Sequence, residues 1–211
     1  MELIFTSFGF NSPIVSEKLQ RCINPAGKSV IVLPFAGFNE ESTFLREKQG
    51  LVQFGFADEC ISLCDKSNFA QFSKVDYIYV PGGDTFKLLS YVKTNGMMEH
   101  IRHLVAEGAV YIGASAGAVL ATSDLEYVTA VEDNNFSLCD FTGLGLCNNV
   151  IVPHFDQMSH SSINSCRVLS DSSRRMLYIK NCDAVVMHGS DAASIDYLIS
   201  PTAPYFSKST D

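Results

Sequence analysis

Short apolar runs alternate with segments of helical periodicity along the first half of the chain, and this alternation restricts the fold more than any other feature. The apolar runs are rich in branched side chains, which is typical of buried strands. They are residues 2–7, 29–36, 76–83 and 109–114. The segments with helical spacing are residues 39–51, 84–96 and 97–108. Strands that alternate with helices favour a parallel sheet with helices on both faces. The sequence therefore predicts an α/β fold with a mostly parallel central sheet.

The second half of the chain has a less regular pattern. Residues 124–135 are predicted to contain a strand and a loop, and residues 148–155 are predicted to be a strand that ends at the same sheet edge. Residues 161–175 have helical spacing, and residues 176–200 are predicted to form two or three antiparallel strands at an edge of the sheet. No repeat or linker interrupts the pattern, so residues 1–211 are predicted to form one domain.

Charge and composition exclude several classes of partner. The chain has 23 acidic and 15 basic residues, and no Lys/Arg cluster that would favour nucleic acid. No apolar run is long enough to span a bilayer, and the amino terminus lacks a basic segment, so a cytoplasmic protein without a membrane partner is expected. The seven cysteines are scattered and are expected to be reduced thiols. A monomer or a homodimer is expected.

A serine lies among very small residues directly after the predicted strand 109–114. Residues 113–117 read Gly-Ala-Ser-Ala-Gly and match G-x-S-x-G, the pattern of a sharp strand-to-helix turn that exposes a serine nucleophile. In this geometry the Ser115 hydroxyl lies at the positive end of a helix, where the N–H of Ala116 can face an oxyanion. The turn at Gly82 and Gly83 ends another predicted strand and can supply a second N–H group. The alternatives are a packing turn and a phosphate-binding turn, but neither segment matches a nucleotide-binding motif.

A serine nucleophile requires a base, and the base requires a group that orients it. His154 lies at the end of the predicted strand segment 148–155 and is the first choice as the base, whereas His160 lies in a polar segment and can bind substrate. The residues alone do not distinguish the acids that can orient the base. These acids are Asp133, Asp140, Asp156, Asp191 and Asp196. No set of residues suggests a metal site, and no cofactor is expected.

Four segments resemble the aspartyl dipeptidase (peptidase E) family, whose relatives include cyanophycinase. They are VPGGDTFKLL (80–89), YIGASAGAVLA (111–121), NVIVPHF (149–155) and the region 185–195. The resemblance implies a three-layer α/β sandwich with the flavodoxin-like topology of class I glutamine amidotransferases, and antiparallel strands toward the carboxyl terminus. It also implies that Ser115 is the nucleophile, His154 the base, and Gly83 and Ala116 the donors of the oxyanion hole.

The region that holds the family's third triad member departs from its pattern. The family has a glutamate there, but this chain reads MHGSDAASI at 187–195, so Asp191 is the predicted triad acid. The resemblance further implies that Arg167 holds the side chain of an amino-terminal aspartate, for which a planar guanidinium is suited. Asp84 either anchors the substrate's ammonium group or repels an aspartyl side chain.

The sequence thus predicts a serine peptidase that hydrolyses short peptides, in particular dipeptides with amino-terminal Asp, by Ser-His-acid acyl transfer. Two alternatives remain open. One is a binding or regulatory module that has lost its catalytic acid. The other is a small α/β-hydrolase-type esterase, which would pair Ser115 with His188 and with Asp133 or Asp140, in the chain order of that class.

Overall fold

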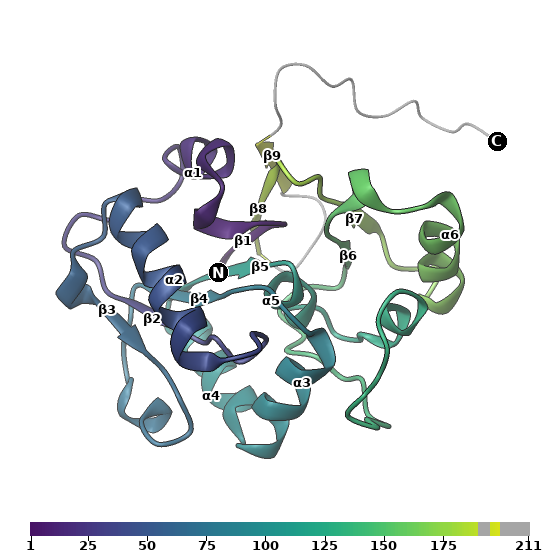
Figure 1. Ribbon diagram of the computed structural model, residues 1–211, viewed down its shortest axis with the longest axis horizontal. Helices are drawn as coiled ribbons and strands as arrows, with labels where there is room; N and C mark the ends of the chain where they lie inside the picture. Colours follow the sequence, from purple (N-terminus) through teal and green to yellow (C-terminus); the bar gives the residue numbers. More distant parts are fainter. Residues whose placement is uncertain (190–194, 199–211) are drawn as a thin grey trace.

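The computed structural model describes residues 1–189 and 195–198, and a seven-stranded sheet lies at its centre (Figure 1). The strand order is β3-β2-β4-β5-β1-β8-β9, and the first five strands of this order are parallel. Their bounds are β1 Glu2–Thr6, β2 Val30–Val32, β3 Ile61–Leu63, β4 Tyr77–Val80 and β5 Val110–Ala114. The antiparallel strands β8 (Ala184–His188) and β9 (Ile195–Leu198) extend the sheet beyond β1. The predicted α/β class and mostly parallel sheet are confirmed.

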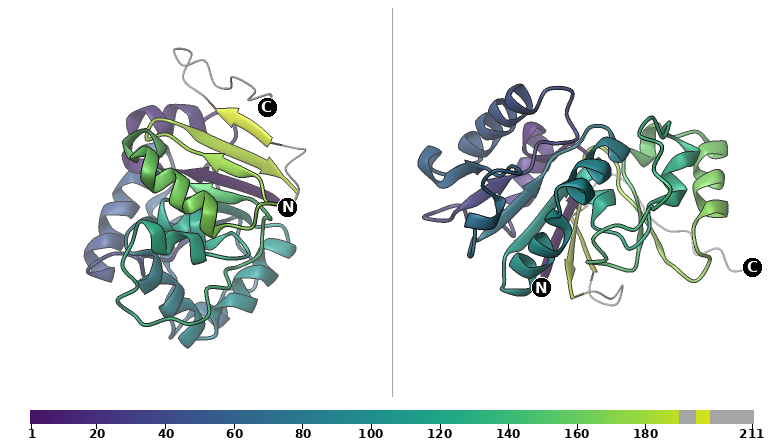
Figure 2. Two further views of the ribbon diagram at one scale, coloured as in Figure 1. Left: turned by 90° about the vertical axis from the view of Figure 1, so that its right-hand side faces the viewer. Right: turned by 90° about the horizontal axis from the view of Figure 1, so that it is seen from below.

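Helices cover both faces of the sheet, which gives three layers (Figures 1 and 2). On one face lie α1 (Pro13–Leu19) and α2 (Glu40–Phe54), and on the other lie α3 (Thr85–Thr94), α4 (Met97–Ala106) and α5 (Ala116–Leu120). The interior strand β1 shows why both layers are needed, because Leu3 and Phe5 join one hydrophobic core and Ile4 joins the other. All three side chains are fully buried, as expected for a parallel strand covered on both sides.

A second, two-stranded sheet lies outside the main one. Strand β6 (Val150–Val152) pairs in parallel with β7 (Met176–Tyr178), and α6 (His160–Leu169) connects them. The predicted strand 148–155 is therefore not a strand of the main sheet, but its end does meet the edge of that sheet, where His154 contacts Ser115 and Ser7. The antiparallel pairing predicted for the start of 176–200 was wrong, because β7 is parallel to β6. Parallel neighbours need a crossover connection, and α6 supplies it.

Three local expectations also need correction. The predicted helix 161–175 ends at Leu169, because Ser170 is extended and a turn at 171–174 follows. The segment 124–135 contains the 3-10 helix η4 (Glu126–Ala130) instead of a strand. Helix α1 was not predicted, although Ser12 and Pro13 occupy the N-cap and first-turn positions in which those residue types are common.

The carboxyl ends of the parallel strands bring several loops together at one edge of the main sheet. The residues that follow β1, β4 and β5 lie there, as ligand-binding residues do in open α/β sheets. Among the described residues, no helix combines the length and the apolar character that crossing a membrane requires.

Candidate active site

Ser115 occupies a strained turn between β5 and α5. Its φ and ψ angles are 50° and −114°, and its N–H group donates to the carbonyl of Thr6 at 2.9 Å. The glycines on either side of the turn allow α5 to lie against the sheet. A Cβ atom on Gly117 would lie 1.9 Å from the Val80 carbonyl oxygen, and one on Gly113 would lie 2.6 Å from the oxygen of Gly117. The G-x-S-x-G pattern therefore has a steric cause, and the strand, turn and helix predicted around Ser115 are present.

His154 follows β6 and faces Ser115. Its Nε2 atom lies 2.9 Å from the Ser115 Oγ. The backbone of His154 is left-handed, with φ 55°, and its N–H group donates to the Ser7 hydroxyl at 2.9 Å. Ser7 in turn donates to the Ile179 carbonyl at 3.1 Å, and the Phe8 ring packs edge-on against the imidazole at 5.1 Å. These contacts fix both the backbone and the ring of His154.

Asn181 holds the other nitrogen of the imidazole. The Oδ1 atom of Asn181 lies 2.6 Å from the His154 Nδ1. Because a carboxamide oxygen can only accept a hydrogen bond, this contact places the imidazole proton on Nδ1. The Nε2 atom then carries the lone pair that faces Ser115, which is the tautomer that a general base requires.

Asn181 was not among the predicted site residues, because a carboxylate is the usual orienting group for a catalytic histidine. Pairing between the two halves of the small sheet brings it to His154: Ile179 donates to the Val152 carbonyl at 2.9 Å, and Phe155 donates to the Ile179 carbonyl at 3.1 Å. The Asn181 N–H also donates to the Asp156 carboxylate at 2.9 Å. The pairing of β6 with β7 cannot be predicted from the residues around Asn181 alone.

The acids considered from the sequence have other positions. Asp191 lies outside the described residues. Asp140 pairs with Lys93, and Asp196 is near His188 at 3.6 Å. Within residues 1–189 and 195–198, the His154 ring contacts none of the acids that were considered from the sequence.

The turn after β4 approaches Ser115 closely. A Cβ atom on Gly82 would lie 2.8 Å from the Ser115 Cβ, and one on Gly83 would lie 2.1 Å from the Ala36 carbonyl oxygen. Gly83 has φ 147°, a backbone conformation that favours glycine. Within the described part of the chain, the N–H groups of Gly83 and Ala116 have no hydrogen-bond acceptor. Both groups are therefore available to an oxyanion beside Ser115.

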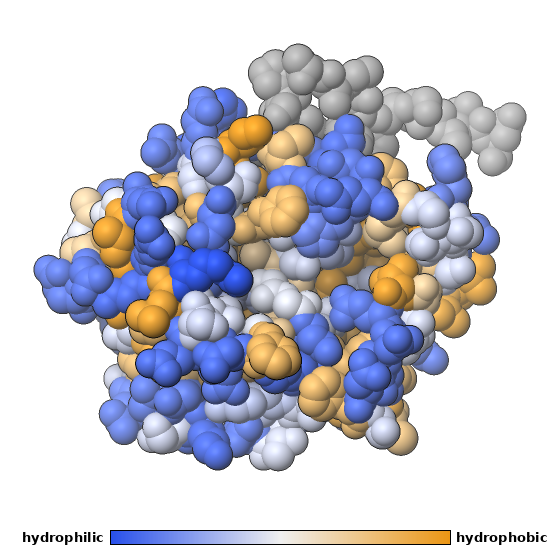
Figure 3. All heavy atoms as spheres, in the orientation of Figure 1, coloured by the Kyte–Doolittle hydropathy of each residue, from blue (hydrophilic) through white to orange (hydrophobic). Residues whose placement is uncertain are grey.

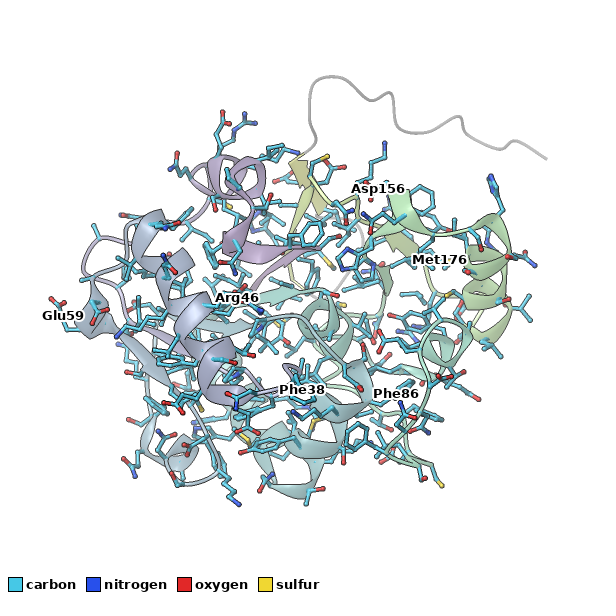
Figure 4. The ribbon with its side chains drawn as sticks, viewed as in Figure 1. Phe38, Arg46, Glu59, Phe86, Asp156 and Met176 are labelled. Atoms are coloured by element: carbon cyan, nitrogen blue, oxygen red, sulfur yellow. The ribbon has the colours of Figure 1, made fainter. Side chains whose placement is uncertain are left out.

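Two cavities meet at Ser115 and His154, which line both of them. The larger has a volume of about 970 Å³, and the smaller about 200 Å³. Arg46 on α2 and Phe38, just before that helix, line the larger cavity and are marked in Figure 4. Polar and apolar side chains lie side by side on the same face of the molecule (Figure 3). The larger cavity also contains the charged residues Glu47, Asp84 and Lys87.

A buried hydrogen-bond network holds Arg46 at this wall. Its Nε and one terminal nitrogen donate to Glu47 Oε1 at 2.9 and 2.7 Å. The other carboxylate oxygen of Glu47 accepts from Asn11 at 2.7 Å and from the Tyr79 hydroxyl at 2.8 Å. The Glu47 side chain is only 4% exposed, whereas that of Arg46 is 60% exposed. The guanidinium is thus anchored from behind and presents its remaining N–H groups to solvent.

The smaller cavity is mostly apolar, although Thr85, Ser115, Glu132 and His154 also line it. Its lining residues include Val119, Tyr127, Val128, Val131, Ile151 and Met158. Among the described residues, the one carboxyl group in its lining belongs to Glu132, which was not among the predicted site residues. The Thr85 N–H donates to Glu132 Oε2 at 3.0 Å, and the Thr85 hydroxyl donates to Oε1 at 2.9 Å. Burial raises the pKa of Glu132 above its ordinary value, Asp84 adds to this effect, and the Thr85 bonds and His154 oppose it.

The three predicted substrate-binding residues do not converge. Asp84 caps α3 by accepting from the Lys87 N–H at 2.8 Å, and it lines the larger cavity. His160 begins α6 and is exposed, and it lines neither cavity. Arg167 is exposed on α6, donates to the Tyr178 hydroxyl at 3.0 Å and also lines neither cavity. The preceding residue, Cys166, is the one that faces the smaller cavity.

The sequence profile described as peptidase family S51 matches residues 3–195. The chain belongs to peptidase family S51. It is therefore a member of a family of serine peptidases, which agrees with the Ser115–His154 contact and with the resemblance to peptidase E noted from the sequence.

Individual relatives support this membership. An uncharacterized peptidase of Listeria monocytogenes is 30% identical over 176 residues, which are 80% of this chain and 86% of that protein. Peptidase E of Shigella flexneri is 32% identical over 149 residues, which are 68% of this chain and 60% of that protein. A crystal structure from Listeria monocytogenes, whose description names peptidase E, has a TM-score of 0.74 and 26% identity and covers 93% of this chain and 96% of its own. The three-layer fold is thus shared with this group.

Proposed function

We propose that this S51 family member is a serine peptidase that hydrolyses short peptides by acyl transfer, with Ser115 as the nucleophile, His154 as the base and Asn181 as the residue that orients the base. The observation that carries the proposal is the chain of two contacts, from Ser115 Oγ to His154 Nε2 at 2.9 Å and from His154 Nδ1 to Asn181 Oδ1 at 2.6 Å. A nucleophile, a base and an orienting group in this arrangement are the requirement for serine catalysis.

The steps follow from the positions of these atoms. His154 Nε2 takes the hydroxyl proton as Ser115 Oγ attacks the peptide carbonyl carbon. The carbonyl oxygen becomes an oxyanion that accepts hydrogen bonds from the N–H groups of Gly83 and Ala116, and one such donor typically contributes about 3 kcal/mol to the stability of the transition state. His154 then gives its proton to the leaving amine. A water molecule, activated by His154, releases the acyl group from Ser115.

Asn181 gives this triad a neutral orienting group. A carboxamide fixes the tautomer and the ring plane of His154, as the asparagine of papain-like proteases does, but it does not offset the charge of the imidazolium that forms during attack. Asn181 alone accounts for orientation of the base among the described residues, so the missing glutamate does not by itself remove catalysis.

Specificity for amino-terminal aspartate has weaker support than peptide hydrolysis. It rests on Arg167, and that guanidinium is bonded to Tyr178 on the exposed face of α6. The cationic side chains Arg46 and Lys87 line the larger cavity, whereas within residues 1–189 and 195–198 no lysine or arginine lines the smaller one. The side-chain preference is therefore a separate question from the reaction.

The experiment is a comparison of wild type with Ser115→Ala on a mixed set of dipeptides and tripeptides, with products identified by mass spectrometry. We expect cleavage by wild type and a loss of at least about 10³-fold in the variant, since the nucleophile is removed. A fluorophosphonate probe should label wild type at Ser115 and leave the variant unlabelled. Wild type that neither cleaves any peptide nor takes up the probe would contradict the proposal and favour a binding module.

A further inference from the structure

The small cavity and Glu132 form one unit beside the Ser115–His154 pair. The walls are aliphatic and aromatic, with Tyr127 and Val128 buried and Met158 half-buried. Glu132 adds a single carboxylate, and two hydrogen bonds from Thr85 hold that carboxylate in place. Each carboxylate oxygen can accept a further hydrogen bond, because it has two lone pairs. The unit therefore combines a site for an apolar side chain with an acceptor for a cation.

The chemistry of an amino-terminal residue matches this combination. Its Cα atom carries both a side chain and an ammonium group, so the two groups reach neighbouring points from one atom. A carboxyl-terminal residue carries a carboxylate instead, which Glu132 would repel. The larger cavity is lined by charges of both signs. Its carboxylates already have partners, since Glu47 accepts from Arg46 and Asp84 accepts from the Lys87 N–H, whereas Arg46 presents a guanidinium with a 60% exposed side chain. The charges of the two cavities thus orient a short peptide across Ser115, with its amino end toward Glu132.

We propose that Glu132 binds the free ammonium group of the substrate and that the adjacent cavity receives an uncharged, apolar amino-terminal side chain, so that the protein selects short peptides with a free apolar amino terminus over aspartyl peptides. This proposal rests on the proposed peptidase function. It assigns a substrate class and a binding residue, Glu132, to the same active site.

An aspartyl side chain is a poor occupant of this cavity. Burying a carboxylate in apolar surroundings is costly unless a cation or several donors pair with it. The described residues of the lining include no lysine or arginine, and Glu132 adds a second negative charge. Transfer of a side chain of the size of valine or leucine from water into this cavity is favourable and stabilises the bound peptide.

The kinetic test uses Leu-Ala, Asp-Ala and N-acetyl-Leu-Ala with wild type, Glu132→Gln and Asp133→Asn. Asp133→Asn is the matched control, because it neutralises the neighbouring carboxylate, which is exposed and lines neither cavity. Glutamine keeps an oxygen that can accept from Thr85. We expect wild type to prefer Leu-Ala over both other peptides by at least about tenfold, and Glu132→Gln to lose about 10- to 100-fold in kcat/KM for Leu-Ala, chiefly through KM. N-acetyl-Leu-Ala should be cleaved equally by wild type and by Glu132→Gln, since it has no ammonium group.

A binding measurement separates this proposal from the proposed reaction. The Ser115→Ala protein, with and without Glu132→Gln, is titrated with Leu-Ala and N-acetyl-Leu-Ala in a calorimeter, where no turnover is needed. Tighter binding of Leu-Ala that is lost with Glu132→Gln supports the ammonium site even if no peptide is cleaved. Preference for Asp-Ala, or equal losses for free and acetylated peptides in Glu132→Gln, would overturn it. Wild type that cleaves no peptide would instead refute the reaction, and the binding result would remain interpretable.

Discussion

Asn181 is the residue whose chemistry differs most from a triad with a carboxylate. We expect Asn181→Ala to lower kcat by about 10²- to 10³-fold, because the imidazole loses the acceptor that fixes its tautomer. We expect Asn181→Asp to stay active, with the acidic limb of its kcat/KM profile at higher pH, because an adjacent carboxylate favours the imidazolium and raises the pKa of the base. Steady-state kinetics across pH measures both effects.

Asp191 provides the comparison for that experiment. If Asn181→Ala keeps wild-type kcat while Asp191→Asn loses activity, the orienting group is the acid predicted from the sequence, and the contact at 2.6 Å is not the catalytic one. Circular dichroism of each variant shows whether the fold is retained.

Glu132 gives a prediction about stability. Burial raises the pKa of this carboxyl in the folded protein, so the folded state binds its proton more tightly than the unfolded state does. The free energy of unfolding then falls as pH rises from the pKa of Glu132 in the unfolded state to its pKa in the folded state. Above the folded pKa this loss of stability reaches its full size. We expect Glu132→Gln to gain stability relative to wild type over this rise, with little gain below pH 4, where both states are protonated. Denaturant titrations at several pH values would show a pH-independent difference if the carboxyl were unperturbed.

At the scale of elements, the loop between β7 and β8 carries Asn181 and is tied to α1. The Lys18 ammonium pairs with Asp183 at 2.8 Å and also donates to the Cys182 carbonyl, and each side chain of the pair is 8% exposed. Replacing Lys18 takes away the cation that faces the buried Asp183 carboxylate, and removing one partner of a buried pair is strongly destabilising. We expect Lys18→Met to lower the free energy of unfolding by about 3 kcal/mol and to lower kcat, since Asn181 lies two residues before Asp183.

Two controls isolate the buried pair. Lys28→Met breaks the exposed Lys28–Asp76 pair and should cost at most about 1 kcal/mol. The double variant Lys18→Met, Asp183→Leu removes both charges and should recover part of the stability, because replacing a whole buried pair is often close to neutral. Urea unfolding measures both variants. Equal decreases in the free energy of unfolding for Lys18→Met and Lys28→Met would show that burial does not make the Lys18–Asp183 pair more important for stability.

At the scale of the whole molecule, the features that could be predicted from the sequence are those that depend on neighbouring residues in the chain. Buried strands, the turn at Ser115 and the position of His154 after a strand are encoded within short segments. Asn181 and Glu132 reach the site through pairing of β6 with β7 and through packing after η4, which single segments do not encode. Arg167 illustrates why side-chain orientation is difficult to predict from the sequence, because a helix turns by about 100° per residue and adjacent positions face different surroundings. Here Cys166 faces the cavity and Arg167 faces solvent.

The two cavities that meet at Ser115 are lined by residues from different halves of the chain, so recognition of each end of the substrate can be tested separately. Arg46 comes from α2 in the first half of the chain, and Glu132 follows η4 in the second. If Arg46 binds the carboxyl end of the substrate, Arg46→Gln should raise KM for Leu-Ala by about 10-fold and leave its amide, Leu-Ala-NH2, unchanged. Lys48→Gln is the matched control, because its ammonium pairs with Asp58 and does not line the cavity. Equal effects of Arg46→Gln on the acid and the amide would mean that Arg46 serves the Glu47 network instead of the substrate.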